Sequence, residues 1–226
     1  MKRPRPTPAA VSACAETRQQ LLEAAGEVFA EAGFRNATVR AICERAGANI
    51  AAVNYHFRDK EALYAEVLRY SQEQALKKYP PSLGVRADAA PAQRLEAFVR
   101  SLLLRMFDEG PIAWHGKLMV REMIDPTAAL GRLAKEKFRP LAEELNTIIS
   151  QLLGCRRQDE RVRLAACSVV SQCVFYHHCR PVVNYLFPAQ KFDARGIEQL
   201  TAHITGFSLA ALKARARDPS RPATKQ

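Results

Sequence analysis

The sequence predicts an all-α protein with two helical domains, and three observations support this prediction. Apolar residues recur at the three- and four-residue spacing of a helix face along most of the 226-residue chain. No stretch alternates convincingly at the two-residue period of a strand, and no internal repeat is visible. The stretch PPSLGVRADAAP is rich in proline and small residues, so we assign residues 79–90 to a linker between the domains.

The composition is typical of a folded protein outside the membrane. Hydrophobic residues make up 48% of the chain and charged residues 25%, which excludes a disordered chain. No apolar run approaches the roughly 18 residues of a membrane span. Prolines occupy the place where a signal peptide would have its apolar segment, and six scattered cysteines fit reduced thiols better than a disulfide framework. We therefore expect a cytoplasmic protein without a membrane partner.

The first domain is expected over residues 16–78. Its first helix begins near Thr17, shows one apolar face and stops at Gly33. Two short helices follow, joined by a turn at Gly47. A longer fourth helix covers the stretch DKEALYAEVLRYSQEQALKKY, whose apolar residues again recur with the period of a helix.

The second domain is expected over residues 91–215. Its third helical pattern contains Pro140, which should kink the helix because proline lacks a backbone N–H. The predicted helices of this domain cover residues 95–106, 118–123, 130–152, 161–179 and 197–212. A flexible basic arm over residues 1–15 and a flexible tail over residues 216–226 should flank the two domains.

The two short helices around Gly47 fit a helix-turn-helix. Ile42 and Val53 fall where these helices must pack on each other. The second helix lies in the stretch RAGANIAAVNYHF, whose small side chains would let its backbone approach base edges in a major groove about 12 Å wide. Five basic residues against two acidic ones between Arg35 and Lys60 make this region locally positive, whereas the net charge of +11 is spread along the chain and is weak evidence. A helical hairpin that does not read DNA is the alternative.

The side chains of this segment suggest which part of a DNA duplex each would contact. Asparagine offers a donor and an acceptor to base edges, alanine and isoleucine can approach thymine methyl groups, and tyrosine, histidine and lysine can reach phosphates. Tyr55 and His56 have an alternative role, because an aromatic side chain at a helix end often covers the core. The residues in question are Asn49, Ile50, Ala51, Ala52, Asn54, Tyr55, His56 and Lys60.

Residues 17–68 resemble the N-terminal domain of TetR-family transcriptional regulators. The resemblance rests on the stretches AGEVFAEAGF, TVRAICERAG and YHFRDKEAL. It implies three DNA-binding helices followed by a C-terminal bundle for dimerisation and effector binding. It also implies operator contacts by Thr38, Asn49, Ile50, Ala51, Asn54, Tyr55, His56 and Lys60. Ile50 and Asn54 depart from the residues that many relatives carry, so no base preference can be transferred.

The C-terminal region resembles the CecR-like (YbiH-like) branch of this family, through stretches such as GPIAWHGKLMVREMIDPTAAL and LAACSVVSQCVFYHHCRPVV. This resemblance implies an effector domain without naming the effector. Together the two resemblances imply a homodimer that binds double-stranded operator DNA and responds to a small molecule. A repressor, rather than an activator, is expected from the resemblance alone.

Two segments could line an effector pocket in the second domain. Soft and aromatic side chains with a few polar groups suit an amphipathic small molecule. The same side chains at helical spacing are often simply core, and the sequence does not choose between these alternatives. The candidate ligand-binding residues are Met106, Trp114, His115, Met119, Met123, Phe175, Tyr176, His177 and His178.

The last two long helices are expected to form a dimer interface. Small residues on the helix over 161–179 and mixed apolar residues on the helix over 197–212 would let two copies close a four-helix bundle around a two-fold axis. The candidate interface residues are Ala165, Ser168, Ile204, Phe207 and Ala211.

The stretch CVFYHHC raises the question of metal or catalytic chemistry. Cys173 and His177 would share a helix face, but no third and fourth ligand at a familiar spacing is evident. No oriented third group accompanies a cysteine and histidine, as a nucleophilic site would require. We therefore expect no metal, no cofactor and no enzyme. A helical module that binds a small molecule or metal without reading DNA is the rival to a DNA-binding regulator.

Overall fold

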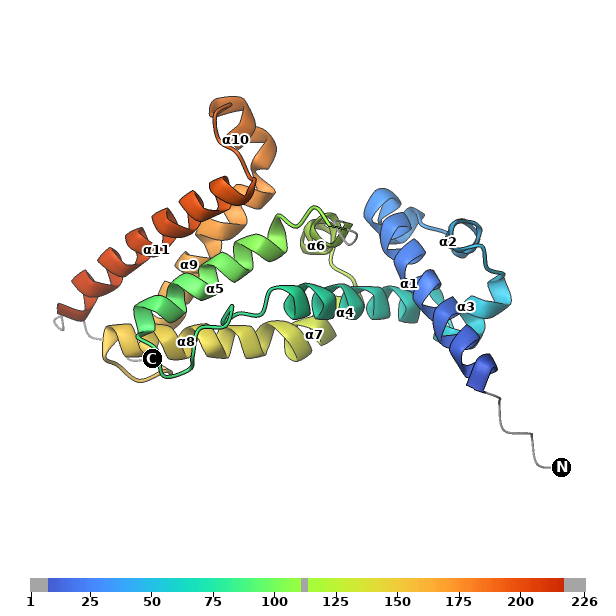
Figure 1. Ribbon diagram of the computed structural model, residues 1–226, viewed down its shortest axis with the longest axis horizontal. Coiled ribbons are helices and arrows are strands. Elements are labelled where there is room, and N and C mark those ends of the chain that lie inside the picture. Colours follow the sequence, from blue (N-terminus) through green and yellow to red (C-terminus); the bar gives the residue numbers. More distant parts are fainter. Residues whose placement is uncertain (1–7, 111–113, 218–226) are drawn as a thin grey trace. The chain divides into compact units, whose positions relative to one another are not determined.

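The computed structural model describes residues 8–110 and 114–217, and within those residues every regular element is a helix (Figure 1). The all-α prediction is confirmed. The chain divides into two compact units, one formed by Met1–Gln74 with Glu109–Leu133 and the other by Ala75–Asp108 with Ala134–Gln226. In the described part of the chain, no helix is both long enough and apolar enough to cross a membrane.

The first unit contains the helix-turn-helix. Its helices are α1 (Pro8–Asn36), α2 (Val39–Ala46), α3 (Ile50–Phe57), α4 (Lys60–Lys78) up to Gln74, α6 (Trp114–Ile124) and α7 (Ala128–Leu133). Its core is made of fully buried apolar side chains, namely Leu21, Leu22, Phe29, Ile42, Val53, Leu63 and Val67. The Phe29 and Tyr64 rings meet edge to face with centroids 4.8 Å apart, which ties α1 to α4.

Helix α1 begins earlier than expected. The flexible arm predicted over residues 1–15 overlaps the first turns of α1, which starts at Pro8. Proline is tolerated in the first turn of a helix because its missing N–H has no partner there, and the alanines that follow favour helix. Gly33 interrupts α1 as predicted, with a φ of 78° that only glycine adopts readily, and a last helical turn then runs to Asn36.

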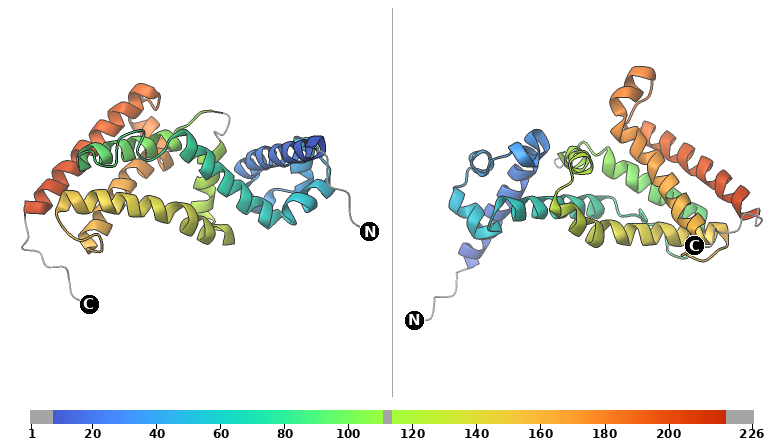
Figure 2. Two further views of the ribbon diagram at one scale, coloured as in Figure 1. Left: turned by 60° about the horizontal axis from the view of Figure 1, so that its bottom comes forward. Right: turned by 180° about the vertical axis from the view of Figure 1, so that it is seen from behind.

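The second unit is a bundle around α5. Its elements are the end of α4, α5 (Pro91–Met106), the π-helical turn η1 (Ala134–Phe138), α8 (Arg139–Leu153), α9 (Glu160–His178), α10 (Arg180–Leu186) and α11 (Ala194–Arg217). Helix α5 packs against α8, α9 and α11, whereas α10 projects away from the other helices of this unit (Figure 2). Its core includes Leu95, Phe98, Leu103, Leu145, Ile148, Ile149, Val162, Val169, Cys173, Leu200 and Ile204.

At the expected kink near Pro140 the helical run continues, but its hydrogen bonding changes to a π-helical turn. Residues 130–152 were predicted as one helix, and the structure divides them among α7, η1 and α8. Pro140 lies in the first turn of α8, where its missing N–H removes a bond that an uninterrupted helix would need. The wider π-helical turn directly precedes it, as is common where a helix is locally interrupted.

The compact units of the structure and the predicted domains are divided differently at one segment. The second domain was expected over residues 91–215, but the segment from Glu109 to Leu133 belongs to the first unit. The reason is that α6 packs along α1 rather than within the C-terminal bundle. The predicted linker, residues 79–90, is short and turn-rich, and the Ser101 hydroxyl donates to the Tyr79 carbonyl across 2.8 Å.

Candidate DNA-binding interface

The helix-turn-helix is fixed by side chains that close the ends of its helices. The Thr38 hydroxyl accepts from the Ala41 N–H at 3.1 Å and caps α2, and the Asn49 side-chain oxygen accepts from the Ala52 N–H at 2.9 Å and caps α3. Gly47 ends α2 in a left-handed conformation with a φ of 62°. Short helices of eight residues depend on such caps, because they have few internal hydrogen bonds.

Helix α3 presents one face to the core and the other to solvent. Val53 and Phe57 are buried against the rest of the unit. On the opposite face Ile50 is 52% exposed and Tyr55 77% exposed, and Ala51 and Asn54 are exposed beside them. Three side chains predicted to approach bases, Ile50, Ala51 and Asn54, therefore lie on one accessible surface with Tyr55, which was predicted to reach a phosphate. We call these four residues the reading face.

Three of the predicted contact residues have structural partners of their own. Thr38 and Asn49 use a side-chain oxygen as a helix cap, so only the remaining hydroxyl or amide hydrogens can turn toward DNA. His56 is half-buried, and burial together with the charge of Arg18 lowers its pKa below the usual value. A neutral imidazole can still donate a hydrogen bond to a phosphate but brings no charge to it.

The prediction that Lys60 reaches a phosphate disagrees with its contacts. Its Nζ donates to the carbonyls of Phe34 and Ala37, both at 3.0 Å, and lies 4.7 Å from the centre of the Phe34 ring. These carbonyls lie at and just beyond the end of α1, where backbone oxygens lack helical partners. Lys60 thus closes α1 from the start of α4, a role that sequence spacing alone does not reveal.

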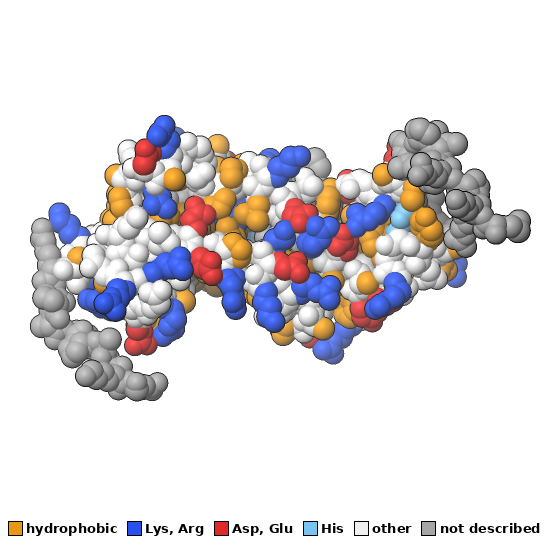
Figure 3. Space-filling view, turned by 90° about the horizontal axis from the view of Figure 1, so that it is seen from below, with side chains coloured by type: hydrophobic (Ala, Val, Ile, Leu, Met, Phe, Trp, Pro, Cys, Tyr) orange, Lys and Arg blue, Asp and Glu red, His pale blue; other side chains and the backbone are white. Residues whose placement is uncertain are grey.

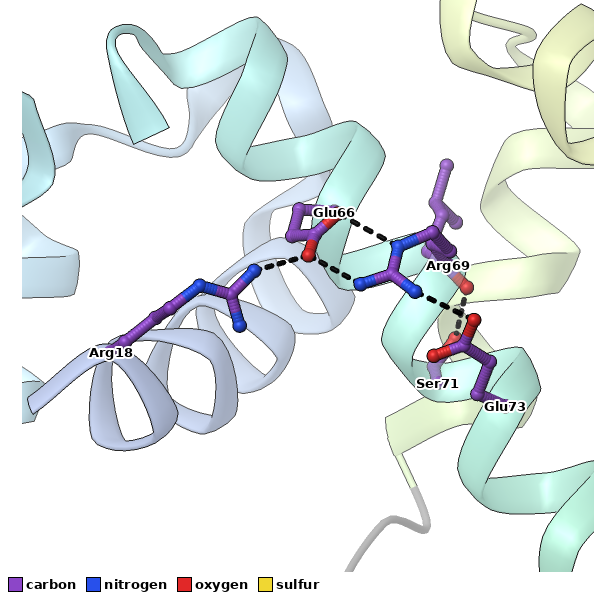
Figure 4. Close-up of polar contacts among 6 residues, drawn as sticks. Arg18, Glu66, Arg69, Ser71 and Glu73 are labelled. Carbon is purple, nitrogen blue, oxygen red and sulfur yellow. Dashed lines mark hydrogen bonds and ion pairs between the residues drawn. The ribbon is translucent and has the colours of Figure 1, made fainter. Parts of the chain in front are cut away.

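An ion network braces α1 against α4 (Figure 4). Arg18 of α1 pairs with Glu66, which also pairs with Arg69, and Arg69 binds Glu73 at 2.6 Å. The hydrogen bonds from Arg69 and Arg18 hold the pKa of the Glu66 carboxyl below its usual value despite burial, so Glu66 stays ionised. The Arg18 guanidinium also lies 5.2 Å from the centre of the Phe57 ring at the end of α3. Arg18 of α1 therefore contacts both α4, through Glu66, and the end of α3, through Phe57.

Helix α6 docks on α1 through the only tryptophan in the chain. The Trp114 indole lies directly over Gly26, where a Cβ would come within 2.4 Å of its ring. Arg121, two turns further along α6, donates to the carbonyls of Ala30 at 2.9 Å and Glu31 at 2.7 Å. We call this docked contact the α1–α6 joint (Gly26, Ala30, Glu31, Trp114 and Arg121).

A buried carboxylate ties α6 to α4 and to the start of α7. Glu122 is fully buried, and one of its oxygens accepts from the Tyr64 hydroxyl at 2.7 Å. The other oxygen accepts from both the N–H and the hydroxyl of Thr127 at 2.9 Å. Burial and the hydrogen bond to Glu122 raise the pKa of Tyr64, which stays protonated. With every oxygen satisfied, this carboxylate holds the three helices in a fixed arrangement.

The residues predicted to line an effector pocket divide between the two units. Trp114, His115, Met119 and Met123 belong to the first unit, and Met106 and the stretch from Phe175 to His178 belong to the second. Trp114 is buried and packs on Gly26, which fits the core alternative for this residue, and its contact with an effector stays a prediction. In the second unit, the His177 ring meets the edge of Phe107 at 5.3 Å, and burial lowers the pKa of His177 to about 4.

Four of the five predicted interface residues line one shallow groove between α9 and α11. These are Ala165, Ser168, Phe207 and Ala211, and Phe207 is 63% exposed. The fifth, Ile204, was wrongly assigned, since it is fully buried in the core of its own bundle and cannot touch a second copy. Phe207, three residues further on, is exposed, whereas Ser208, four residues further on, is buried like Ile204.

Charge and possible metal ligands add little to the definition of a site. On the face seen in Figure 3, Lys and Arg side chains alternate with Asp and Glu, so the net charge of +11 does not form one basic field there. Within residues 8–110 and 114–217, no three His, Cys, Asp or Glu side chains are grouped as a metal site would require. All six cysteines are free thiols.

Comparison with known proteins agrees with this arrangement. The model of the C-terminal domain of the HTH-type transcriptional dual regulator CecR matches residues 91–212, and that of bacterial regulatory proteins of the tetR family matches residues 21–67. The chain is 26% identical over 204 residues to the HTH-type transcriptional dual regulator CecR of Shigella flexneri, covering 84% of this chain and 88% of that protein.

Two solved structures share the fold. A putative transcriptional regulator from Pseudomonas aeruginosa PAO1 matches with a TM-score of 0.64 at 22% identity, over 87% of this chain and 92% of that one. AibR, in complex with isovaleryl coenzyme A and operator DNA, matches with a TM-score of 0.63 at 18% identity, over 84% of this chain and 97% of that one.

Proposed function

Since the chain belongs to the TetR family of transcriptional regulators and carries a CecR-type C-terminal domain, we propose that it is a homodimeric repressor that a small molecule releases from operator DNA. Its relatives are transcriptional regulators and not enzymes. Membership of the family supports DNA binding directly. Repression, effector release and dimerisation rest on the features below.

The reading face is the observation that carries the proposal. Its four side chains are uncharged and exposed. Two of them, Ile50 and Tyr55, are large and apolar, and their exposure to water is unfavourable in free energy. A major groove accommodates such a helix, because small side chains allow close approach and Asn54 can pair with a base edge. Tyr55, the most exposed of the four, is suited to a phosphate at the rim of the groove.

Dimerisation would use the groove between α9 and α11. Exposed Phe207 and Leu164 lie beside small residues there, which suits two copies packing around a two-fold axis. A dimer is needed because helix-turn-helix proteins read two half-sites about one helical turn of DNA apart.

The α1–α6 joint supports the ligand-responsive part of the proposal. Helix α6, which follows α5 in the sequence, docks on α1. Helices α2 and α3 pack on the same helix α1. An effector that binds better when α6 is displaced would therefore favour a state in which α1 and the reading face are also displaced. Differential affinity for the two states is sufficient for release.

A mobility-shift assay on the DNA upstream of the gene tests the proposal. Wild type should retard this DNA, and footprinting should show two half-sites. Ala51→Glu, which places a carboxylate on the reading face, should abolish retardation without loss of stability because Ala51 is exposed. Ala142→Glu, at an exposed alanine of α8, is the matched control and should bind normally. Equal retardation by both variants would reject the reading face as the DNA contact, and failure of wild type to retard the DNA would support the rival function, a helical module that does not read DNA.

A further inference from the structure

Arg105 is a buried cation with an unused hydrogen-bonding edge. It lies in the last turn of α5 and is only 5% exposed. Its Nε donates to the Ser101 carbonyl at 3.2 Å, and its Nη2 is buried with no hydrogen-bond partner. Buried guanidinium groups are normally paired, because an unpaired charge loses its hydration without compensation.

The neighbours of Arg105 do not neutralise it. Cys173 of α9 lies close enough to interact with its charge, but burial raises the pKa of this thiol to about 12, so it stays neutral. Glu144 of α8 is the one carboxylate whose charge reaches Arg105, and among the described residues no ion pair within 4 Å joins them. Burial lowers the pKa of Arg105 to about 10, which still leaves it charged at neutral pH.

The same end of the bundle holds further unused polar atoms next to apolar rings. His177 follows Cys173 by one helical turn, so both side chains lie on one face of α9. The Nδ1 atoms of His177 and His178 are buried without a partner. The buried Phe107 ring stacks on Phe192 with centroids 4.7 Å apart, meets His177 edge to face, and lies 5.8 Å from the Arg180 guanidinium.

We propose that Arg105 is the anchor for the carboxylate of an organic monoanion, whose apolar part packs on Phe107 and His177. This inference rests on the proposed function, because it names the chemical class of the effector. The fork of a guanidinium binds the two oxygens of a carboxylate side by side. Because the negative charge of Glu144 also reaches Arg105, the single charge of a carboxylate fits better than the double charge of a phosphate dianion.

Calorimetric titration of the full-length protein with benzoate, phenylacetate and hexanoate tests this assignment. The matched amides benzamide, phenylacetamide and hexanamide have the same shapes without the charge. At least one acid should bind, and its amide should bind at least tenfold more weakly. Arg105→Met should weaken the acid roughly 10- to 100-fold, the loss expected for a charge-assisted hydrogen-bonded pair. The proposal is overturned if no acid binds, if acid and amide bind alike, or if Arg105→Met binds the acid like wild type.

Two further variants separate a ligand anchor from a structural charge. Arg105→Met should raise the melting temperature of the unliganded protein, because it removes a buried unpaired charge, whereas loss of a structural ion pair would lower it. Glu144→Gln should tighten acid binding by removing a negative charge that reaches Arg105. Arg100→Met, one turn earlier on α5 in a half-exposed pair with Glu198, is the matched control and should leave acid binding unchanged. A lower melting temperature for Arg105→Met would refute the role of Arg105 as a ligand anchor. Weaker acid binding by Glu144→Gln would refute it as well.

The same protein samples separate this inference from the proposed function. Operator binding is measured by mobility shift without any acid. Retardation of DNA together with no acid binding would reject the anchor and keep the regulator. Acid binding that depends on Arg105, together with no retardation, would keep the anchor and reject the regulator. Inorganic phosphate, titrated in parallel, should not compete, and competition by phosphate would overturn the assignment to a monoanion.

Discussion

Gly26→Ala should weaken the α1–α6 joint. The new Cβ would lie 2.4 Å from the Trp114 ring, whereas ordinary contacts begin at 3.4 Å, so the ring must retreat by about 1 Å. Trp114 is 8% exposed and packed, so this retreat should shift α6 as well. Overpacking of this kind costs about 1–3 kcal/mol. Replacing glycine by alanine inside a helix returns about 0.5–1 kcal/mol, which partly offsets that cost.

Gly131→Ala is the matched control. Gly131 lies inside α7 of the same unit, and a Cβ there meets nothing within 4 Å. This variant should gain about 0.5–1 kcal/mol of unfolding free energy. The difference in stability between the two alanine variants therefore isolates the collision with Trp114, and we expect it to be about 1–3 kcal/mol.

Urea unfolding followed by Trp114 emission measures both the stability and the joint, because the chain has no other tryptophan. Emission of the folded Gly26→Ala protein should shift to the red as the ring leaves its apolar site. Trp114→Leu should remove most of the penalty of Gly26→Ala when the two are combined, as a double-mutant cycle followed by circular dichroism would report. Unchanged emission, with Gly26→Ala as stable as Gly131→Ala, would refute the packing of Trp114 on α1.

Three further predictions concern Lys60, Phe207 and His177. Lys60→Met should lower the free energy of unfolding by about 1–3 kcal/mol, because two carbonyls lose a charged donor. It should leave the salt dependence of operator binding unchanged. A salt slope reduced by about one unit would show instead that Lys60 contacts a phosphate. Phe207→Glu should sediment as a monomer without specific DNA binding, and an intact dimer would reject the α9–α11 interface. The folded-state pKa of His177, about 4, lies below the unfolded value of 6.5, so the unfolded chain takes up the proton first and stability should fall as pH drops from 6.5 to about 4. His177→Phe should remove this contribution, at most about 3 kcal/mol, from urea unfolding compared at pH 7 and pH 4.5; the same pH dependence in the variant would contradict the assignment.

The helix-turn-helix could be predicted from the sequence because its signals are local. Gly47 marks the turn, and the apolar positions at Ile42 and Val53 fix which faces of two short helices meet. The helical period then brings Ile50, Ala51 and Asn54 to the exposed side of the second helix, away from buried Val53.

The role of Lys60 and the docking of α6 could not be predicted in this way. Lys60 binds carbonyls 23 and 26 residues earlier, and Arg121 binds carbonyls 90 and 91 residues earlier. Helical periodicity carries no information about such distant partners. The sequence did hold one signal of this docking. Gly26 is an isolated glycine inside a segment that otherwise favours helix, and such a glycine often marks the close approach of another group.

The separation between capping residues and the reading face has a consequence for the evolution of operator specificity. Thr38, Asn49 and Lys60 are bound to the backbone of their own domain, so changing them costs stability. The reading-face side chains are exposed, and substitutions at exposed positions usually change stability by less than about 0.5 kcal/mol. Under the proposed function, substitutions at the four reading-face positions would change the operator at little cost in the free energy of folding.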